Sequence, residues 1–102
     1  NDLIYGSGEP GSWEFEIVDD GEFVGADAAL QVSDSGIQIL YFDGFNNDMK
    51  RAVATGDGWT VEQVTGDQGA LGFHNEIITA GGVRFAGCYD YTSRTMWFSQ
   101  LN

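Results

Sequence analysis

The sequence predicts an all-β protein assembled from repeated antiparallel units, and three observations support this class. No segment places apolar residues at the i, i+3 and i+4 spacing of an amphipathic helix. The 15 glycines among 102 residues separate short runs rich in β-branched and aromatic side chains. A pattern of residues also recurs at an offset of 46 or 47 positions, which indicates a repeated supersecondary unit.

The first four predicted strands cover residues 2–6, 13–18, 26–32 and 37–42. Gly, Ser and Pro residues at 7–12 end the first strand. The second strand alternates apolar and acidic residues, so it is predicted to be half-buried, with Trp13, Phe15 and Ile17 on one face and the two glutamates in water. The third strand is rich in small residues. The fourth is apolar enough to be a central strand covered on both faces.

The remaining strands are predicted at residues 48–54, 59–64, 73–79 and 83–89, with a ninth that starts at Thr95. Residues 46–64 repeat the opening of the chain, which defines one unit at about 1–46, a second at about 47–94 and the start of a third at 95–102. The matched pairs are Asn1 and Asn47, Asp2 and Asp48, Leu3 and Met49, Trp13 and Trp59, Glu16 and Glu62, and Val18 and Val64.

A four-stranded antiparallel unit of this length indicates a β-propeller blade, because one blade cannot cover both of its faces and stacks against neighbours. The small-residue strand 26–32 suits the crowded position beside the channel, strand 37–42 the middle of the sheet, and strands 13–18 and 59–64 the rim. Closed propellers need about four to eight blades. Because this chain has only about two blades, it is predicted either to associate with copies of itself or to be part of a larger propeller.

The same residues resemble a repeat of bacterial β-propellers whose usual form is W-x-x-E-x-V-D, G-x-x-x-S-L, D-x-x-G, Y-Y-D and L-K-Y-A. The second unit departs from that form, with Asn75-Glu76 for Ala28-Ala29 and Gly87-Cys88 for Leu40-Tyr41. The resemblance implies a propeller fold with a binding or scaffolding role, and it implies no fixed catalytic residues. The matching positions are Trp59, Glu62, Val64, Ala29, Leu30, Asp34, Gly36 and residues 41–43 and 47–52.

Composition narrows the classes of partner. A net charge of −12, from 16 acidic and 4 basic residues, argues against nucleic-acid binding and against anionic membrane surfaces. It favours positive partners, divalent cations or plain solubility. No run is long enough for a transmembrane helix, and a secreted, periplasmic or cell-surface location is expected from the acidic balance and the resemblance. The single Cys88 is expected to be a small buried residue.

The turns of an antiparallel unit alternate between its two ends, so those at 19–22, 43–47, 67–68 and 90–93 are predicted to make one end acidic. Asp43, Asn46, Asp48 and Asp90 offer carboxylate and amide oxygens of the kind that hold Ca²⁺, although their spacing is not that of an EF-hand. The alternative interpretation is that these side chains form hydrogen-bonded turns with their own backbone.

Four further residues are candidates for ligand binding. Trp13 and Trp59 recur once per unit and could stack on sugar rings; the alternative is packing between blades. His74 and Glu76 interrupt the repeat and are two apart on a strand, so their side chains are predicted to point the same way. For this pair the alternative is a hydrogen-bonded structural contact.

No catalytic motif, phosphate-binding loop or zinc-ligand spacing is present, so the chain is predicted not to be an enzyme. The sequence favours a non-catalytic β-propeller module for protein interaction or structural assembly, with copies of itself or a larger assembly as the partner. A lectin-like propeller that binds carbohydrate is the alternative function. A fragment of a propeller enzyme is the third hypothesis.

Overall fold

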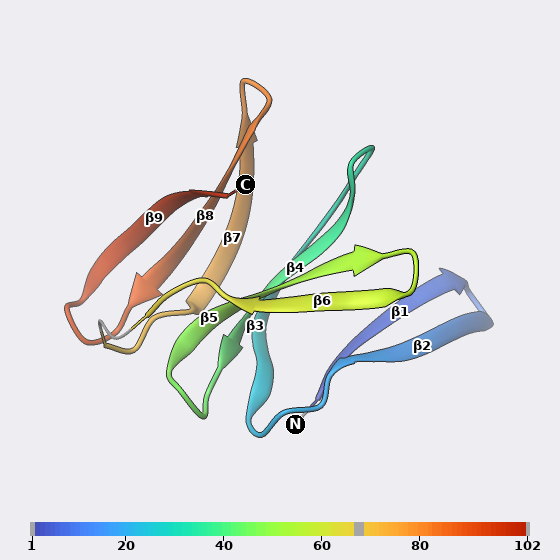
Figure 1. Ribbon diagram of the computed structural model, residues 1–102, viewed down its shortest axis with the longest axis horizontal. Helices are drawn as coiled ribbons and strands as arrows, with labels where there is room; N and C mark the ends of the chain where they lie inside the picture. Colours follow the sequence, from blue (N-terminus) through green and yellow to red (C-terminus); the bar gives the residue numbers. More distant parts are fainter. Residues whose placement is uncertain (1, 67–68, 102) are drawn as a thin grey trace.

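The computed structural model describes residues 2–66 and 69–101, which form nine β-strands and no helix (Figure 1). All nine strands predicted from the sequence are present, and the all-β class is confirmed. No described segment is a helix of the length and hydrophobicity needed to cross a membrane. The strands are β1 (Leu3–Glu9), β2 (Ser12–Asp19), β3 (Val24–Ser33), β4 (Gly36–Asp43), β5 (Asp48–Thr55), β6 (Gly58–Gln63), β7 (Phe73–Ala80), β8 (Val83–Asp90) and β9 (Thr95–Leu101).

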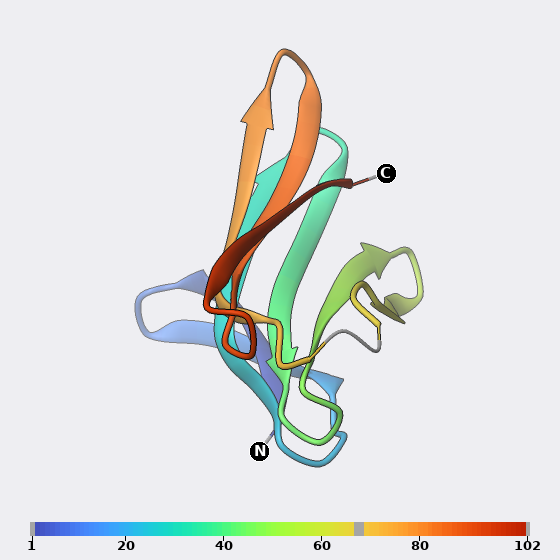
Figure 2. The same ribbon diagram turned by 90° about the vertical axis from the view of Figure 1, so that its left-hand side faces the viewer.

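The strands form three open antiparallel sheets in chain order. β1 pairs with β2, β3 to β6 form the central sheet, and β7 to β9 form a three-stranded sheet. The sheet boundaries fall after β2 and after β6, so each sequence unit of about 46 residues extends over two sheets (Figure 1). The β3–β4 and β7–β8 hairpins lie side by side (Figure 2), where Gln31 Nε2 donates a hydrogen bond of 2.8 Å to Thr79 Oγ1.

Two hydrophobic clusters cover the two faces of the central sheet. Leu40 and Tyr41 are adjacent on β4 and fully buried, and they join different clusters because successive side chains of a strand alternate between faces. This confirms β4 as a strand covered on both faces. The cluster towards β1–β2 is Leu3, Val18, Val24, Ile39, Tyr41 and Ala52, and the cluster towards β7–β9 is Leu40, Met49, Leu71, Ala86, Cys88 and Leu101.

The sequence repeat relates these two clusters. Five of the six residues of the first cluster have a counterpart 46 or 47 positions later that lies in, or packs against, the second. The pairs are Leu3 and Met49, Val18 and Val64, Val24 and Leu71, Ile39 and Ala86, and Tyr41 and Cys88. The same packing of one sheet on another therefore occurs twice in the chain. Cys88 is fully buried, as predicted for a small core residue.

The prediction that the apolar face of β2 is buried is wrong. Trp13, Phe15 and Ile17 do share a face, but they are 52%, 71% and 59% exposed. The described sheets cover only the opposite face of the β1–β2 sheet, which carries Leu3 and Val18. We call the uncovered faces of the β1–β2 and β7–β9 sheets the outer faces of the stack.

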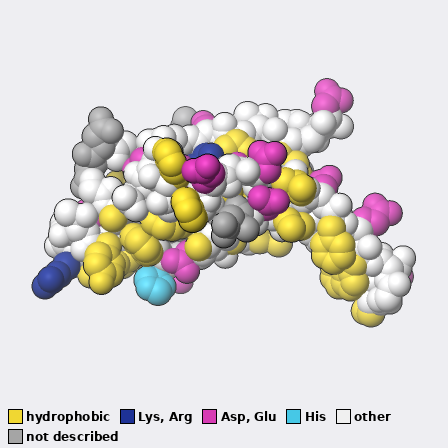
Figure 3. All heavy atoms as spheres, turned by 90° about the horizontal axis from the view of Figure 1, so that it is seen from below, with side chains coloured by type: hydrophobic (Ala, Val, Ile, Leu, Met, Phe, Trp, Pro, Cys, Tyr) yellow, Lys and Arg dark blue, Asp and Glu magenta, His cyan; other side chains and the backbone are white. Residues whose placement is uncertain are grey.

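Three of the four turns predicted to share one end of the molecule do so. The β2–β3, β4–β5 and β8–β9 turns lie at the lower side of Figure 1, and this side is called the turn end. Residues 67–68, the fourth predicted turn, lie outside the described residues. The turn end is not only acidic, because Phe23, Phe45 and Tyr91 are exposed on its turns and hydrophobic and acidic side chains alternate across it (Figure 3).

Candidate functional site

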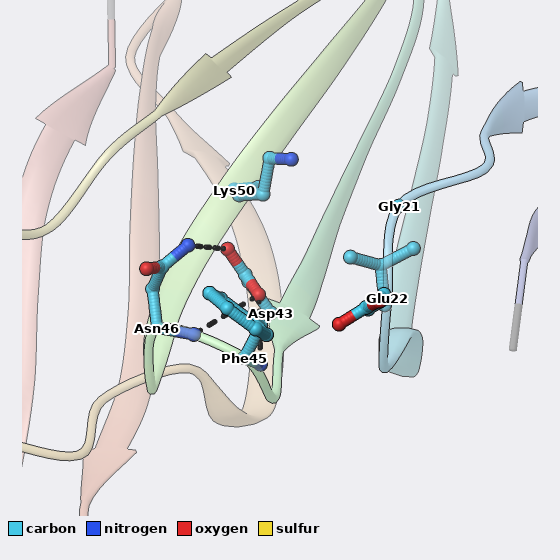
Figure 4. Close-up of a pocket in the computed structure, with 7 residues that line it drawn as sticks. Gly21, Glu22, Asp43, Phe45, Asn46 and Lys50 are labelled. Carbon is cyan, nitrogen blue, oxygen red and sulfur yellow. Dashed lines mark hydrogen bonds between the residues drawn. The ribbon is translucent and has the colours of Figure 1, made fainter.

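A pocket of about 250 Å³ opens at the turn end, between the β2–β3 loop and the β4–β5 turn. The Glu22 carboxylate points from the loop towards the turn, which carries the exposed Phe45 ring (Figure 4). A hydrogen bond of 2.7 Å from the backbone nitrogen of Gly44 to the carbonyl of Phe23 fixes the spacing of the two segments. The loop contributes Gly21, Glu22 and Val24 to the lining, and the turn and β5 contribute Asp43, Phe45, Asn46 and Lys50.

Asp43 holds the turn that forms one wall of this pocket. Its Oδ1 accepts hydrogen bonds from the backbone nitrogens of Phe45 at 2.9 Å and Asn46 at 3.2 Å, and its Oδ2 accepts one from Asn46 Nδ2 at 2.8 Å. Asp43 is almost completely buried, so its carboxylate organises the backbone of the turn.

The other two candidate calcium ligands do not line this pocket, although Asp48 is paired with Asp43 across the β4–β5 ladder. Asp90, in the β8–β9 turn, accepts from the backbone nitrogens of Ser93 and Thr92, and hydrogen bonds from these residues lower the pKa of Asp90. Asp48 is buried at the start of β5 and accepts from Thr65 Oγ1 at 3.0 Å. Within residues 2–66 and 69–101, no three His, Cys, Asp or Glu side chains gather closely enough to hold a metal ion.

Beside the pocket, Asp19 joins the first two sheets. Its Oδ2 accepts hydrogen bonds of 2.7 Å from both Tyr41 Oη and Lys50 Nζ, and its Oδ1 accepts one from the backbone nitrogen of Gly21. Burial acts to raise the pKa of Asp19, but the bonds from Lys50, Tyr41 and Gly21 outweigh it and the pKa is lowered. Burial, followed by the hydrogen bond to Asp19 and the Asp19 charge, raises the pKa of Tyr41.

The lowered pKa of Asp19 predicts a contribution to stability that acid removes. A carboxyl whose pKa is lower in the folded than in the unfolded state stabilises the fold above the unfolded value, and this contribution disappears as the pH falls through the folded value. Asp19→Asn is therefore expected to reduce the free energy of unfolding at neutral pH and to flatten its loss below pH 3.8. Urea unfolding across this range, with Glu9→Gln as the control, measures both effects. An unchanged acid dependence in Asp19→Asn would contradict the assignment.

The two candidate tryptophans, Trp13 and Trp59, lie on opposite sides of the β1–β2 sheet. Trp59 packs against the cluster between this sheet and the central one, with its ring centroid 5.2 Å from that of Tyr5. Its Nε1 donates a hydrogen bond of 2.6 Å to Glu16 Oε1. Trp13 lies on the outer face. Trp59 therefore packs between sheets, and the structure does not bring the two rings together.

His74 and Glu76 are both exposed on β7. The β7–β8 ladder pairs Phe73 with Tyr89 and Glu76 with Gly87, so a bulge lies between them, and His74 has a φ of +53°. This bulge interrupts the strict alternation from which a common direction was predicted. No hydrogen bond or ion pair joins the two side chains in the described part of the chain.

The pocket combines residues that sequence reasoning found with residues that it missed. Asp43 and Asn46 were candidates because of their oxygens, whereas Glu22 and Phe45 belong to no motif and Lys50 was noted only as part of the repeat. A difference between the two units could have pointed to Glu22, Phe45 and Lys50. The second unit has Gly69, Thr92 and Trp97 at the equivalent positions. Neither a protein-family model, nor a curated protein, nor a solved structure matches this chain.

Proposed function

We propose that this chain is a non-catalytic assembly module whose sheets stack against those of further copies to build a β-propeller. The observation that carries the proposal is the relation between its outer faces and its internal interfaces. The two apolar outer faces are the repeat counterparts of the two faces that already pack inside the chain. Large apolar surfaces of this kind are typical of interaction sites.

The outer face of β1–β2 corresponds to the face of the central sheet that packs on β1–β2. By the 46-residue offset, Trp13 is the counterpart of Trp59 and Phe15 is the counterpart of Val61. Trp59 packs against the cluster between the two sheets. An equivalent neighbouring sheet would cover Trp13 in the same way.

The outer face of β7–β9 corresponds to the face of the central sheet that packs on β7–β9. Met96 is the counterpart of Met49, which is fully buried in the second cluster, yet Met96 is 71% exposed. Phe98 and Ile78 are exposed on the same face. The two outer faces are therefore the two halves of one kind of interface.

Contact between unlike faces of identical chains is heterologous, and it closes into a ring where the rotation between neighbours permits. The chain-order sheets and the hydrogen bond between the adjacent strands β3 and β7 support a radial arrangement, as does the resemblance of the repeat to propeller blades. The alternative lectin function receives no comparable support, because Trp13 and Trp59 lie on opposite sides of a sheet.

Two charge-introducing variants test the head-to-tail contact. Phe15→Glu places a charge on the outer face of β1–β2, and Phe98→Glu places one on the outer face of β7–β9. Both positions are exposed, so each variant is expected to fold. Each variant alone is expected to remain monomeric, because one of the two faces needed for the contact is blocked. An equimolar mixture retains one intact face of each kind and is expected to form a one-to-one dimer in sedimentation velocity. Protection of the buried Cys88 thiol from reagents verifies folding.

The control is Phe23→Glu, which changes a similarly exposed aromatic residue on the turn end and should leave the oligomer intact. Continued oligomerisation of Phe15→Glu alone would show that the contact joins like faces or other surfaces. A mixture that stays monomeric would also contradict the proposal.

A further inference from the structure

We propose that the pocket between the β2–β3 loop and the β4–β5 turn binds an alkylammonium group, such as the side chain of a lysine on a partner. The pocket lies within one chain, at the turn end, and its lining includes no residue of either outer face. Its occupation is therefore a separate property from the stacking of sheets.

The charge of the pocket favours a cation. Glu22 and Asp43 line it, and Lys50 is its one basic lining residue. The Lys50 charge is already matched, because its Nζ lies 2.7 Å from Asp19 Oδ2. Glu22, in contrast, has no hydrogen bond or ion pair with any described residue. The uncompensated charge of the site is consequently negative.

The shape of the pocket favours a cation on an apolar stem. The Phe45 ring is 64% exposed at one wall, and an aromatic face attracts an ammonium group within about 6 Å of its centroid. Val24 lines the opposite wall and offers methyl groups to the stem. A volume of about 250 Å³ accommodates a side chain of lysine size and is small for a larger ligand.

The second unit differs at the two positions that would bind such a ligand. Gly69 and Thr92 stand where the first unit has Glu22 and Phe45, so these two positions carry neither a carboxylate nor an aromatic ring. The loop there lies directly on the turn, because Ala70 N donates to Thr92 Oγ1 at 2.9 Å and a Cβ on Gly69 would be 2.7 Å from Thr92. The proposed site is thus particular to the first unit.

Titration of the isotope-labelled full chain with Nα-acetyl-lysine methylamide, followed by amide chemical shifts, tests the proposal. We expect saturable shifts at Gly21, Phe45 and Asn46, and weaker binding as the salt concentration rises. Nα-acetyl-norleucine methylamide has the same stem without the charge, and methyl glucoside is an uncharged polyol. Either probe, if it binds as well as the lysine derivative, would overturn the assignment to an ammonium group.

Two variants connect the binding to the pocket. Glu22→Gln removes the charge at nearly constant shape, and Phe45→Leu removes the aromatic face; each is expected to weaken binding roughly two- to fivefold. Glu9→Gln, an exposed glutamate on β1 away from the pocket, should bind the lysine derivative unchanged. Equal affinity in Glu22→Gln and Glu9→Gln would refute the role of the pocket, whatever the oligomeric state of the chain.

Discussion

Gly72→Ala is expected to destabilise the fold by about 2–4 kcal/mol, because two costs add at this position. Gly72 has a φ of +100°, which residues with a side chain rarely adopt, and a Cβ there would lie 2.9 Å from the carbonyl oxygen of Asp48. That carbonyl belongs to the backbone just before the buried Met49, so it cannot yield without disturbing the second cluster. Urea unfolding measures the loss.

Two further glycines make this test specific. Gly25 is the counterpart of Gly72, with a φ of +102° and an approach of 3.1 Å to the carbonyl oxygen of Asp2, so Gly25→Ala should cost a similar amount. Gly56 has open space around it, and Gly56→Ala should change the free energy of unfolding by less than about 0.5 kcal/mol. Equal losses at Gly56 and Gly72 would refute the explanation by close approach.

Leu40→Ala is expected to cost about 2–5 kcal/mol, since Leu40 is fully buried and its truncation leaves a cavity between the central and β7–β9 sheets. Leu40→Met, which nearly conserves volume, should cost less than about 1.5 kcal/mol. The Cys88 thiol reports on the same cluster: burial raises the pKa of Cys88, so its reaction with a disulfide reagent should accelerate in Leu40→Ala. Similar costs for both variants would contradict this account of the cluster.

The strands could be predicted because their signals are local. The alternation at Trp13, Phe15 and Ile17 correctly indicates a strand and a shared face. It does not reveal whether another sheet covers that face, because burial depends on the arrangement of distant segments. Likewise, the alternation around His74 did not reveal the bulge, which appears only in the pairing with β8.

The candidate site was less predictable because it is made by contacts across sheets. Asp19, Tyr41 and Lys50 come from three strands and form one hydrogen-bonded cluster. No local sequence motif predicts these hydrogen bonds. A comparison of the two units gives an indication of this cluster, because the second unit has Thr65, Cys88 and Trp97 at the three equivalent positions. The oxygens of Asp43 were recognised correctly as a local feature, and the structure shows them bound to their own turn.

The native mass of the unmodified chain, measured by light scattering over a range of dilutions, tests the assembly most directly. Stacking through the outer faces predicts a discrete oligomer whose mass is a whole-number multiple of the monomer mass. The part of the tryptophan fluorescence that comes from Trp13 is then shielded from soluble quenchers. A monomer that unfolds cooperatively while its outer faces remain accessible to solvent would contradict the assembly.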